Sequence, residues 1–327
     1  MKSVRITYDQ IPEFEPMSAA IGYFDGLHLG HQQLISEAEK EAEKKNLKSA
    51  LITFDPDPWA VFRPDANRDH LQTMKQKEQM ARALGLDEMI VIDFSKEFAA
   101  LSPDEFHRML KSMNVQHLVC GFDFSYGFHG SGNPETLKNQ TDFEVEVIDS
   151  VNDEKEKISS SRIEALVRNG EVQKAGELLG SLYCIEGEVV HGFKRGSRLL
   201  GFPTANLKCE SGLVIPEKGV YAGLAEVDGR LYEAMINIGK NPTFQNDDMS
   251  IEAHLLNFEG DLYGKEVRFF FAKRIRPEIR FENPDQLKKQ LAEDESQVGP
   301  LLSEMTPLIE RTAALWRLSP DFDIIRK

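Results

Sequence analysis

The sequence predicts a Rossmann-like α/β domain, followed by a six-stranded antiparallel β-barrel with a C-terminal helix. In the first half, short apolar runs alternate with helical patterns. In the second half, strand patterns follow one another without helices between them. The chain has 327 residues, more than most single domains, so we expect two domains, 1–182 and 183–327.

The first half contains the elements of a βαβα series. Strand patterns cover 17–23, 48–54, 88–94, 116–120 and 143–148. Helical patterns cover about 30–46, 73–84 and 103–113. This order predicts a parallel sheet covered on both faces. Such sheets bind ligands beyond the carboxyl ends of their strands, where the glycine-containing turns of this chain fall.

Two short helical patterns, 161–168 and 172–179, could form the connection to the second half. After them the sequence is rich in strand patterns. Strand patterns cover 183–191, 205–208, 220–227, 231–238, 250–257 and 266–272. Asp228-Gly229 between two of them is a strong hairpin signal. A helical tail follows from about 284 to 318, and we expect a break near Gly299-Pro300.

Composition excludes several classes of protein. The net charge is −15 and both halves are acidic, which argues against nucleic acid or an anionic membrane as the main partner. Cys120, Cys184 and Cys209 form no C-x-x-C pair, so we expect reduced thiols rather than disulfides or a zinc site. We see neither a signal peptide nor an apolar stretch of about 18 residues, and we expect a cytoplasmic protein.

A glycine-rich basic segment precedes the second strand pattern of the second half. Its candidate phosphate-binding residues are Gly192, Lys194, Arg195, Gly196, Gly201 and Pro203. Thr204 and Asn206 are two positions apart on an extended segment, so both point the same way and offer the oxygen ligands that Mg²⁺ prefers. No P-loop motif occurs. The pattern indicates a phosphate and magnesium site, although a plain glycine-rich turn entering a strand would also fit.

A second candidate site follows the first strand pattern. His28 and His31 are three residues apart at the start of a helix, with Gly26 and Gly30 in the same turn. A helix N-terminus with two imidazoles forms an anion site that suits nucleotidyl transfer, where charge builds on the departing pyrophosphate. Surface or capping histidines are an alternative, and a zinc pair is another, without a clear third ligand.

Two further segments could converge on the same edge of the sheet. Asp123 and Phe124 follow a strand and could form a flat apolar slot, or an ordinary aromatic core loop. Ser159, Ser160 and Arg162 precede or open a helix, where the hydroxyls can bind phosphate or only cap the helix.

These segments, in this order, resemble the bacterial bifunctional riboflavin kinase/FAD synthetase family over nearly the whole chain. In the first half the resemblance rests on 24–31, 53–58, 121–127 and 158–162. In the second half it rests on 192–206, 219–221, 237–239, 242–244, 252–256 and 261–265.

The resemblance implies two activities. The first module would join FMN to the AMP part of ATP and release pyrophosphate, with His28 and His31 as catalytic residues. The second would phosphorylate the 5′-hydroxyl of riboflavin with MgATP. There Thr204 and Asn206 would bind Mg²⁺ and phosphates, and Glu252 would be the general base, aimed into the barrel mouth.

The resemblance also implies binding residues and substrates. Asn237 would contact ATP, and the candidate flavin contacts are Asp123, Phe124, Tyr263 and Arg276. The expected partners are riboflavin, FMN and ATP, with FAD as a product. We expect no nucleic acid and no membrane among the partners, and self-association is left open.

Three positions in the first module depart from the family pattern. Tyr23 replaces a small residue, Asp57 replaces a histidine and Glu164 replaces an arginine. If both carboxylates face ATP, the repulsion costs on the order of several kcal/mol. We therefore hypothesise an intact kinase with weakened, altered or lost FAD synthesis.

Three other functions remain open from the sequence. One is a kinase whose first domain is a non-catalytic flavin- or nucleotide-sensing module. Another is a flavin-responsive regulator without turnover, which would not need the Thr204, Asn206 and Glu252 set. A third is an active transferase with another nucleotidyl donor or acceptor.

Overall fold

The computed structural model describes residues 1–62, 69–190, 204–240 and 249–318, and it divides into two compact units. The first unit comprises 1–68 and 74–159, and the second comprises 69–73 and 160–327. The short segment 69–73 lies with the second unit, where the backbone of His70 bonds to Gly212 and Val214 at 2.6 and 2.9 Å. The module boundary near residue 182 stays a prediction.

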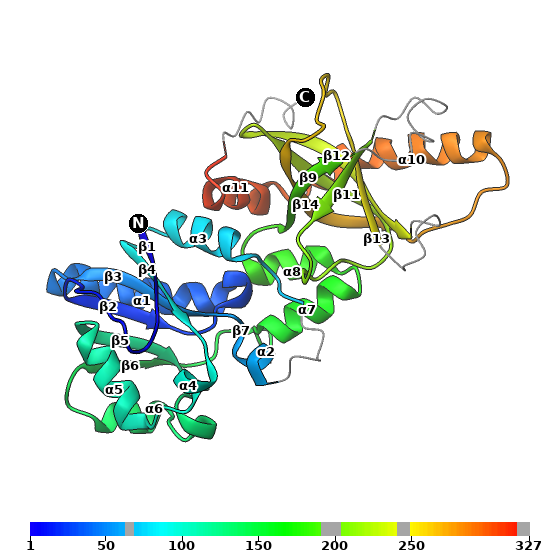
Figure 1. Ribbon diagram of the computed structural model, residues 1–327. Helices are drawn as coiled ribbons and strands as arrows, with labels where there is room; N and C mark the ends of the chain where they lie inside the picture. The colour runs from blue at the N-terminus through cyan, green and yellow to red at the C-terminus, as the bar shows by residue number, and fades with distance from the viewer. Residues whose placement is uncertain (63–68, 191–203, 241–248, 319–327) are drawn as a thin grey trace. The chain divides into compact units, whose positions relative to one another are not determined.

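The first unit is built on one six-stranded sheet in the order β1-β4-β3-β2-β5-β6 (Figure 1). The strands are β1 Lys2–Ile6, β2 Met17–Ile21, β3 Lys48–Asp55, β4 Glu88–Asp93, β5 Val115–Gly121 and β6 Glu144–Ile148. Every neighbouring pair is parallel, which confirms the predicted α/β class. The sequence analysis missed β1, because this edge strand is short and mostly exposed and so lacks an apolar run.

Helices and short turns connect these strands. The helical segments are η1 Asp25–Leu27, α1 Leu29–Lys45, α2 Pro58–Phe62, α3 Met74–Ala83, α4 Lys96–Ala99, α5 Pro103–Ser112, η2 Phe128–Gly130 and α6 Pro134–Asn139. A small hairpin is formed by β7 Asn152–Asp153 and β8 Glu156–Lys157. Local sequence explains the start of α5, where Ser102 and Glu105 form a capping box and Pro103 occupies the first turn.

The order of the strands fixes where a ligand can bind. β2 lies between β3 and β5, so the chain leaves β2 toward one side of the sheet and later adds β5 on the other side. The carboxyl end of β2 is therefore a topological switch point, the usual ligand position in open α/β sheets. The segment from Gly22 to His28 follows β2 there, and α1 then packs on β2, β3 and β5.

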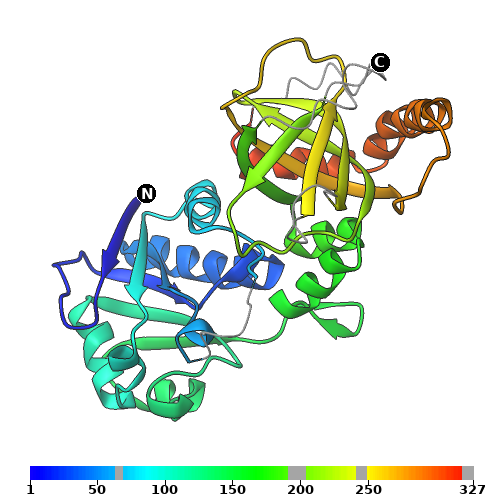
Figure 2. The ribbon, with the colours of Figure 1, turned by 45° about the vertical axis from the view of Figure 1, so that its right-hand side comes forward.

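The second unit contains a closed barrel in the order β10-β13-β12-β11-β14-β9 (Figure 2). The strands are β9 Tyr183–Val190, β10 Ala205–Cys209, β11 Gly219–Val227, β12 Arg230–Lys240, β13 Met249–Leu255 and β14 Glu266–Arg276. All six pairings are antiparallel, which confirms the predicted barrel. Asp228 and Gly229 both have positive φ, 51° and 83°, as the predicted two-residue hairpin turn requires.

In the described part of the second unit, the helices are α7 Ser160–Arg168, α8 Val172–Leu179, α10 Pro284–Ser303 and α11 Thr306–Leu315. The predicted break near Gly299-Pro300 is wrong, because α10 continues through Pro300 and ends three residues later. A proline removes only one backbone donor, and the fully buried Val298 and Leu302 pack this turn. Within the described residues, no helix is long and apolar enough to cross a membrane.

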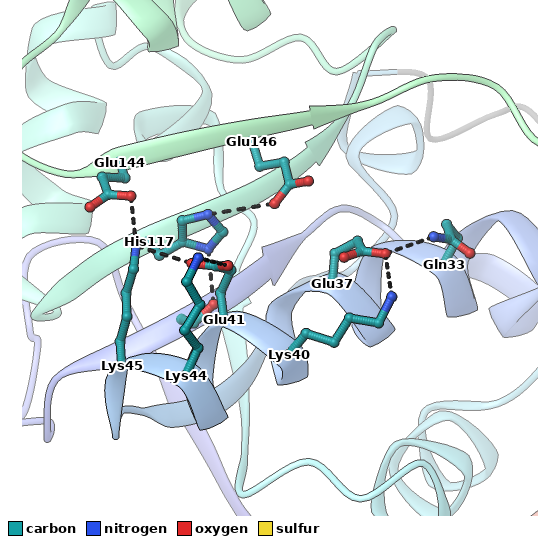
Figure 3. Close-up of polar contacts among 10 residues, drawn as sticks. Gln33, Glu37, Lys40, Glu41, Lys44, Lys45, His117, Glu144 and Glu146 are labelled. Atoms are coloured by element: carbon teal, nitrogen blue, oxygen red, sulfur yellow. Dashed lines mark hydrogen bonds and ion pairs between the residues drawn. The ribbon is translucent and has the colours of Figure 1, made fainter.

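A polar row crosses the face of the sheet that α1 covers (Figure 3). The Ser18 hydroxyl is 3.0 Å from His117 Nδ1, and His117 Nε2 is 3.7 Å from Glu146. Lys45 at the end of α1 bonds Glu144 at 2.6 Å. Burial is the main cause that lowers the pKa of His117, with the Lys45 charge second. At neutral pH His117 is therefore neutral, and its contact with Glu146 is not an ion pair.

We expect the stability of the first unit to fall as the pH drops below about 6.5. The folded state lowers the pKa of His117, so the unfolded chain binds the proton more readily and acid favours unfolding. The melting temperature measured at pH 7.5 and 5.5 checks this. His117→Gln is expected to reduce the difference between the two melting temperatures, and an unchanged difference would contradict the assignment to His117.

Candidate active sites

A strained turn links β2 to α1. Phe24, Gly26 and Leu27 have φ values of 58°, 84° and 42°, in the left-handed region. Each such non-glycine residue costs of order 1–3 kcal/mol and persists only where its surroundings hold it. The carbonyl oxygens of Tyr23 and Leu27, at either side of the turn, accept bonds from Lys77 Nζ at 2.7 Å and Gln32 Nε2 at 2.8 Å.

The two histidines meet directly after this turn. His28 is the N-cap of α1, and its Nδ1 accepts from the backbone N–H of His31 at 3.3 Å. The two rings stack with centroids 3.6 Å apart. An added Cβ at Gly30 would lie 3.1 Å from the His28 ring, so the glycine makes room for the stack.

Both imidazoles are held neutral. Burial lowers the pKa of His28 to about 4, and burial together with the neighbouring His28 lowers the pKa of His31 well below its usual range. His31 Nδ1 is buried without a hydrogen-bond partner in the part of the chain that the structure describes. The pair therefore offers neutral donors and acceptors rather than fixed positive charge.

Two lysines that the sequence analysis missed supply the positive charge. Both Lys77 and Lys157 lower the pKa of His31 electrostatically. Lys157 Nζ lies 2.5 Å from Asp123 and 4.7 Å from the centre of the Phe122 ring. Helical spacing in the sequence gives a signal for Lys77, because it lies on the same stripe of α3 as apolar residues. The buried residues of α3 are Gln76, Lys77, Met80 and Ala81.

Asp57 and Tyr23, two of the departures from the family pattern, lie near Lys77. Asp57 is almost completely buried, accepts from the Trp59 N–H at 2.7 Å and acts electrostatically on Lys77. The Tyr23 ring centre is 4.6 Å from Lys77 Nζ. Burial, followed by Asp57, raises the pKa of the Tyr23 hydroxyl. The negative charge of Asp57 thus faces a buried cation.

Glu164, the third departure, is in α7 of the second unit. Its carboxylate accepts from Arg168 Nε at 2.9 Å, and Arg168 also bonds Asp69 at 2.7 Å. This carboxylate is therefore part of an ion-pair network within its own unit.

The structure brings part of the two other predicted segments close to the histidines. The Ile158 carbonyl oxygen lies 3.9 Å from the Cβ position of Gly30, so the chain passes the start of α1 immediately before Ser159. Ser160 begins α7, and Arg162 is in its first turn. Phe124 packs against Tyr126 with ring centres 5.8 Å apart, at the edge of the core.

In the barrel, strand register aligns three predicted residues in one row. Asn206 on β10 pairs with Glu252 on β13, and Glu252 pairs with Asn237 on β12. Directly paired residues on antiparallel strands project from the same face of the sheet. Residues far apart in sequence therefore present two carboxamides on either side of one carboxylate.

This row lies on the outer face of the barrel wall. On β13, Ile251, Ala253 and Leu255 are buried, whereas Ser250, Glu252 and His254 between them are half-buried. In a closed small barrel the fully buried, apolar side of a strand faces the interior. Glu252 therefore points away from the interior, and the expectation that it is aimed into the barrel mouth is corrected.

Glu252 is suited to accept a proton. Burial raises the pKa of its carboxyl, and a hydrogen bond from the Thr204 side chain partly opposes this shift. Thr204, Asn206 and Glu252 together present hydroxyl, amide and carboxylate oxygens, the ligand types that hard cations such as Mg²⁺ prefer. Within the described ranges, no group of three or more His, Cys, Asp or Glu side chains could hold a metal ion.

The two flavin-contact candidates of the second unit differ in their surroundings. The Tyr263 side chain is exposed, and its backbone N–H bonds to Asp261. Arg276 is held by the fully buried Asp294 of α10 at 2.7 Å, and a further N–H donates to the Pro277 carbonyl. These bonds support a structural role for Arg276 in attaching α10 to β14, and its flavin contact stays a prediction.

Six predicted phosphate-binding residues lie outside the described residues: Gly192, Lys194, Arg195, Gly196, Gly201 and Pro203. Their roles stay predictions.

Comparison with known proteins assigns a family to each half of the chain. The family model of FAD synthetase matches residues 10–162, and that of riboflavin kinase matches residues 179–302. The protein named bifunctional riboflavin kinase/FMN adenylyltransferase of Bacillus subtilis is 39% identical over 91% of this chain and 97% of its own length. A protein of the same name from Listeria monocytogenes is 37% identical over 92% and 96%.

A solved structure is similar to most of the chain. It is titled as a macrolide-efflux protein from Streptococcus pneumoniae, has a TM-score of 0.85 and is 36% identical, covering 91% of this chain and 99% of its own. Both family models and the relatives that match nearly end to end show that this chain belongs to the bifunctional riboflavin kinase/FAD synthetase family.

Proposed function

We propose that this chain makes FMN from riboflavin and ATP in its barrel, and FAD from FMN and ATP in its Rossmann-like domain. The observation that carries the proposal is the row of Asn206, Glu252 and Asn237, with Thr204 bonded to Glu252. A binding protein without turnover would not need a proton acceptor beside a set of phosphate and cation ligands.

In the kinase reaction Glu252 is the general base. Its raised pKa favours proton uptake from the 5′-hydroxyl of riboflavin as that oxygen attacks the γ-phosphorus of ATP and ADP leaves. Thr204 and Asn206 would hold Mg²⁺, which when bound neutralises charge on the transferred phosphoryl group. Asn237, on the other side of Glu252 in the row, would donate its amide to phosphate.

In the transferase reaction His28 and His31 are neutral donors. The FMN phosphate attacks the α-phosphorus of ATP, and the bond to pyrophosphate breaks. The stacked imidazoles and the N–H groups at the start of α1 would stabilise the negative charge that builds on these oxygens. Ser159, Ser160 and Arg162 would complete the phosphate contacts, with Asp123 and Phe124 at the flavin and Lys157 as an added cation.

The structure gives less support than the sequence to the hypothesis that Asp57 and Glu164 weaken FAD synthesis. Asp57 is placed where Lys77 offsets its charge, and Glu164 is paired with Arg168. We propose FAD synthesis in a cytoplasmic enzyme rather than a kinase with a sensing domain. The family models of two enzymes match the two halves of the chain, which supports an enzyme rather than an efflux protein. Self-association and the lack of nucleic-acid binding stay predictions.

A product assay tests both activities. One reaction receives riboflavin with MgATP, a second receives FMN with MgATP, and each is repeated with EDTA in excess over magnesium. We expect FMN in the first reaction, FAD in the second and neither with EDTA. FMN without FAD would leave the kinase with a non-catalytic first domain, whereas no FMN at all would overturn the roles of Thr204, Asn206 and Glu252.

A further inference from the structure

Lys77 is a buried lysine that neither sequence motif nor proposed mechanism uses. It is on α3, is only 3% exposed, and its ammonium donates to the Tyr23 carbonyl at 2.7 Å and to Thr53 Oγ1 at 3.4 Å. A buried ammonium costs much free energy unless it is paired and hydrogen-bonded. The cost of burying the Lys77 ammonium therefore has to be offset by specific interactions, which point to a role other than packing.

The first reason is the turn that carries the histidines. The Tyr23 carbonyl stands directly before the left-handed residues of the turn. The bond that it accepts comes from Lys77 on α3, which packs against the turn but is not part of it. A bond from a charged donor is about twice as strong as a neutral one. Together with the bond from Gln32 to Leu27, it holds the strained backbone at both sides and so sets the position of His28.

The second reason is charge. Asp25, Asp55 and Asp57 all act on Lys77 and raise its pKa, although burial outweighs them and brings it to about 8. Without the ammonium, these carboxylates would repel an anionic triphosphate at the same end of the sheet. Lys77 therefore balances the negative charge that Asp57 adds relative to the family pattern.

We propose that Lys77 is a positioning residue of the transferase site, which clamps the Tyr23 carbonyl at the entry to the histidine turn and offsets the charge of Asp57. The inference rests on the proposed FAD synthesis. It gives α3 a part in the transferase reaction and explains how the buried carboxylate of Asp57 is accommodated near Tyr23.

Lys77→Met tests the inference, because methionine keeps an unbranched apolar stem but loses the charge and the donor. We expect kcat/KM for FAD synthesis to fall by about tenfold to a hundredfold. The rate of FMN formation by the same chain is expected to stay unchanged, because the barrel of the second unit carries that activity. The matched control Lys40→Met, which removes an exposed lysine of α1, is expected to leave both rates unchanged.

The substitution Asp57→Asn, made with and without Lys77→Met, tests whether Lys77 acts on the site through charge or only stabilises the fold. In the Lys77→Met chain it is expected to recover FAD synthesis several-fold, because the unbalanced carboxylate is gone. In the chain with Lys77 it is expected to change the rate much less. Equal effects in both chains, or FAD synthesis by Lys77→Met within about twofold of the wild type, would overturn the inference.

The pH profile of the chain with Lys77 gives a test that does not depend on the folding of a variant. The charged and titratable groups that face Lys77 are Asp25, Asp55, Asp57, Tyr23 and His31. We expect kcat/KM for FAD synthesis to fall as the pH rises through about 8, where the free enzyme loses the Lys77 proton.

Asp57→Asn is expected to move this step to lower pH, because Asp57 raises the pKa of Lys77. If the pH at which kcat/KM falls does not change, Lys77 is not the group that titrates. No FAD from the wild type at any pH would instead mean that the proposed transferase function is wrong.

Discussion

Glu252→Gln is expected to slow FMN formation by about a hundredfold to ten thousandfold, the range for loss of a general base. The amide keeps the size and one acceptor oxygen, so Thr204 can still bond to it, but it does not take up a proton. Since the carboxyl of Glu252 has a raised pKa in a partly buried place, it is matched to this task. The measurement is the steady-state rate of FMN formation from riboflavin and MgATP.

Two controls accompany this variant. Glu188→Gln removes an exposed carboxylate from β9 of the same barrel and is expected to leave the rate unchanged. FAD formation from supplied FMN by the Glu252→Gln chain is expected to match the wild type, because it uses the other domain. A kinase rate within a few-fold of the wild type would refute the assignment of Glu252 as the base.

His31→Asn is expected to lower FAD synthesis by about a hundredfold to a thousandfold, as for loss of one preorganised donor to transition-state charge. His31 is chosen over His28 because its Nδ1 has no partner among the described residues, whereas His28 caps α1. The rate of conversion of FMN and MgATP into FAD measures this effect. FMN formation by the same chain should be unaffected.

The exposed histidine His129 provides the matched comparison, and His129→Asn should retain full FAD synthesis. The expected pattern is loss with His31→Asn and not with His129→Asn. If both variants made FAD at the wild-type rate, the stacked histidines would be structural, and the transferase would have to be sought elsewhere in the sheet.

Local sequence was sufficient for most of the fold. The strand and helix patterns reproduce the parallel sheet and the six barrel strands, and Asp228-Gly229 marks its hairpin, because turn residues and side-chain periodicity are local properties. The edge strand β1 and the end of α10 were not found. An exposed edge needs no apolar run, and the burial of Val298 and Leu302 outweighs the proline signal.

The sequence identified residues of the candidate sites, but the structure was needed to show which of them lie together. The sequence named Glu252, Asn206 and Asn237 as separate motif residues, but only strand register aligned them in one row. The alternating burial on β13 placed that row on the outer face of the barrel. Register is a long-range property, because the paired residues lie on strands that are distant in the chain.

The sequence by itself determined the family, the two-domain order and the turn in which His28 and His31 occur, since motif spacing and composition are written in the chain. Only the tertiary structure decided which charges meet. From the sequence, Asp57 is an unbalanced carboxylate, whereas in the structure the buried Lys77 of α3 acts on it electrostatically. Burial lowers the pKa of both histidines, and the sequence does not specify that burial. Charge balance and pKa depend on neighbours in space and on exclusion of water, which no local pattern specifies.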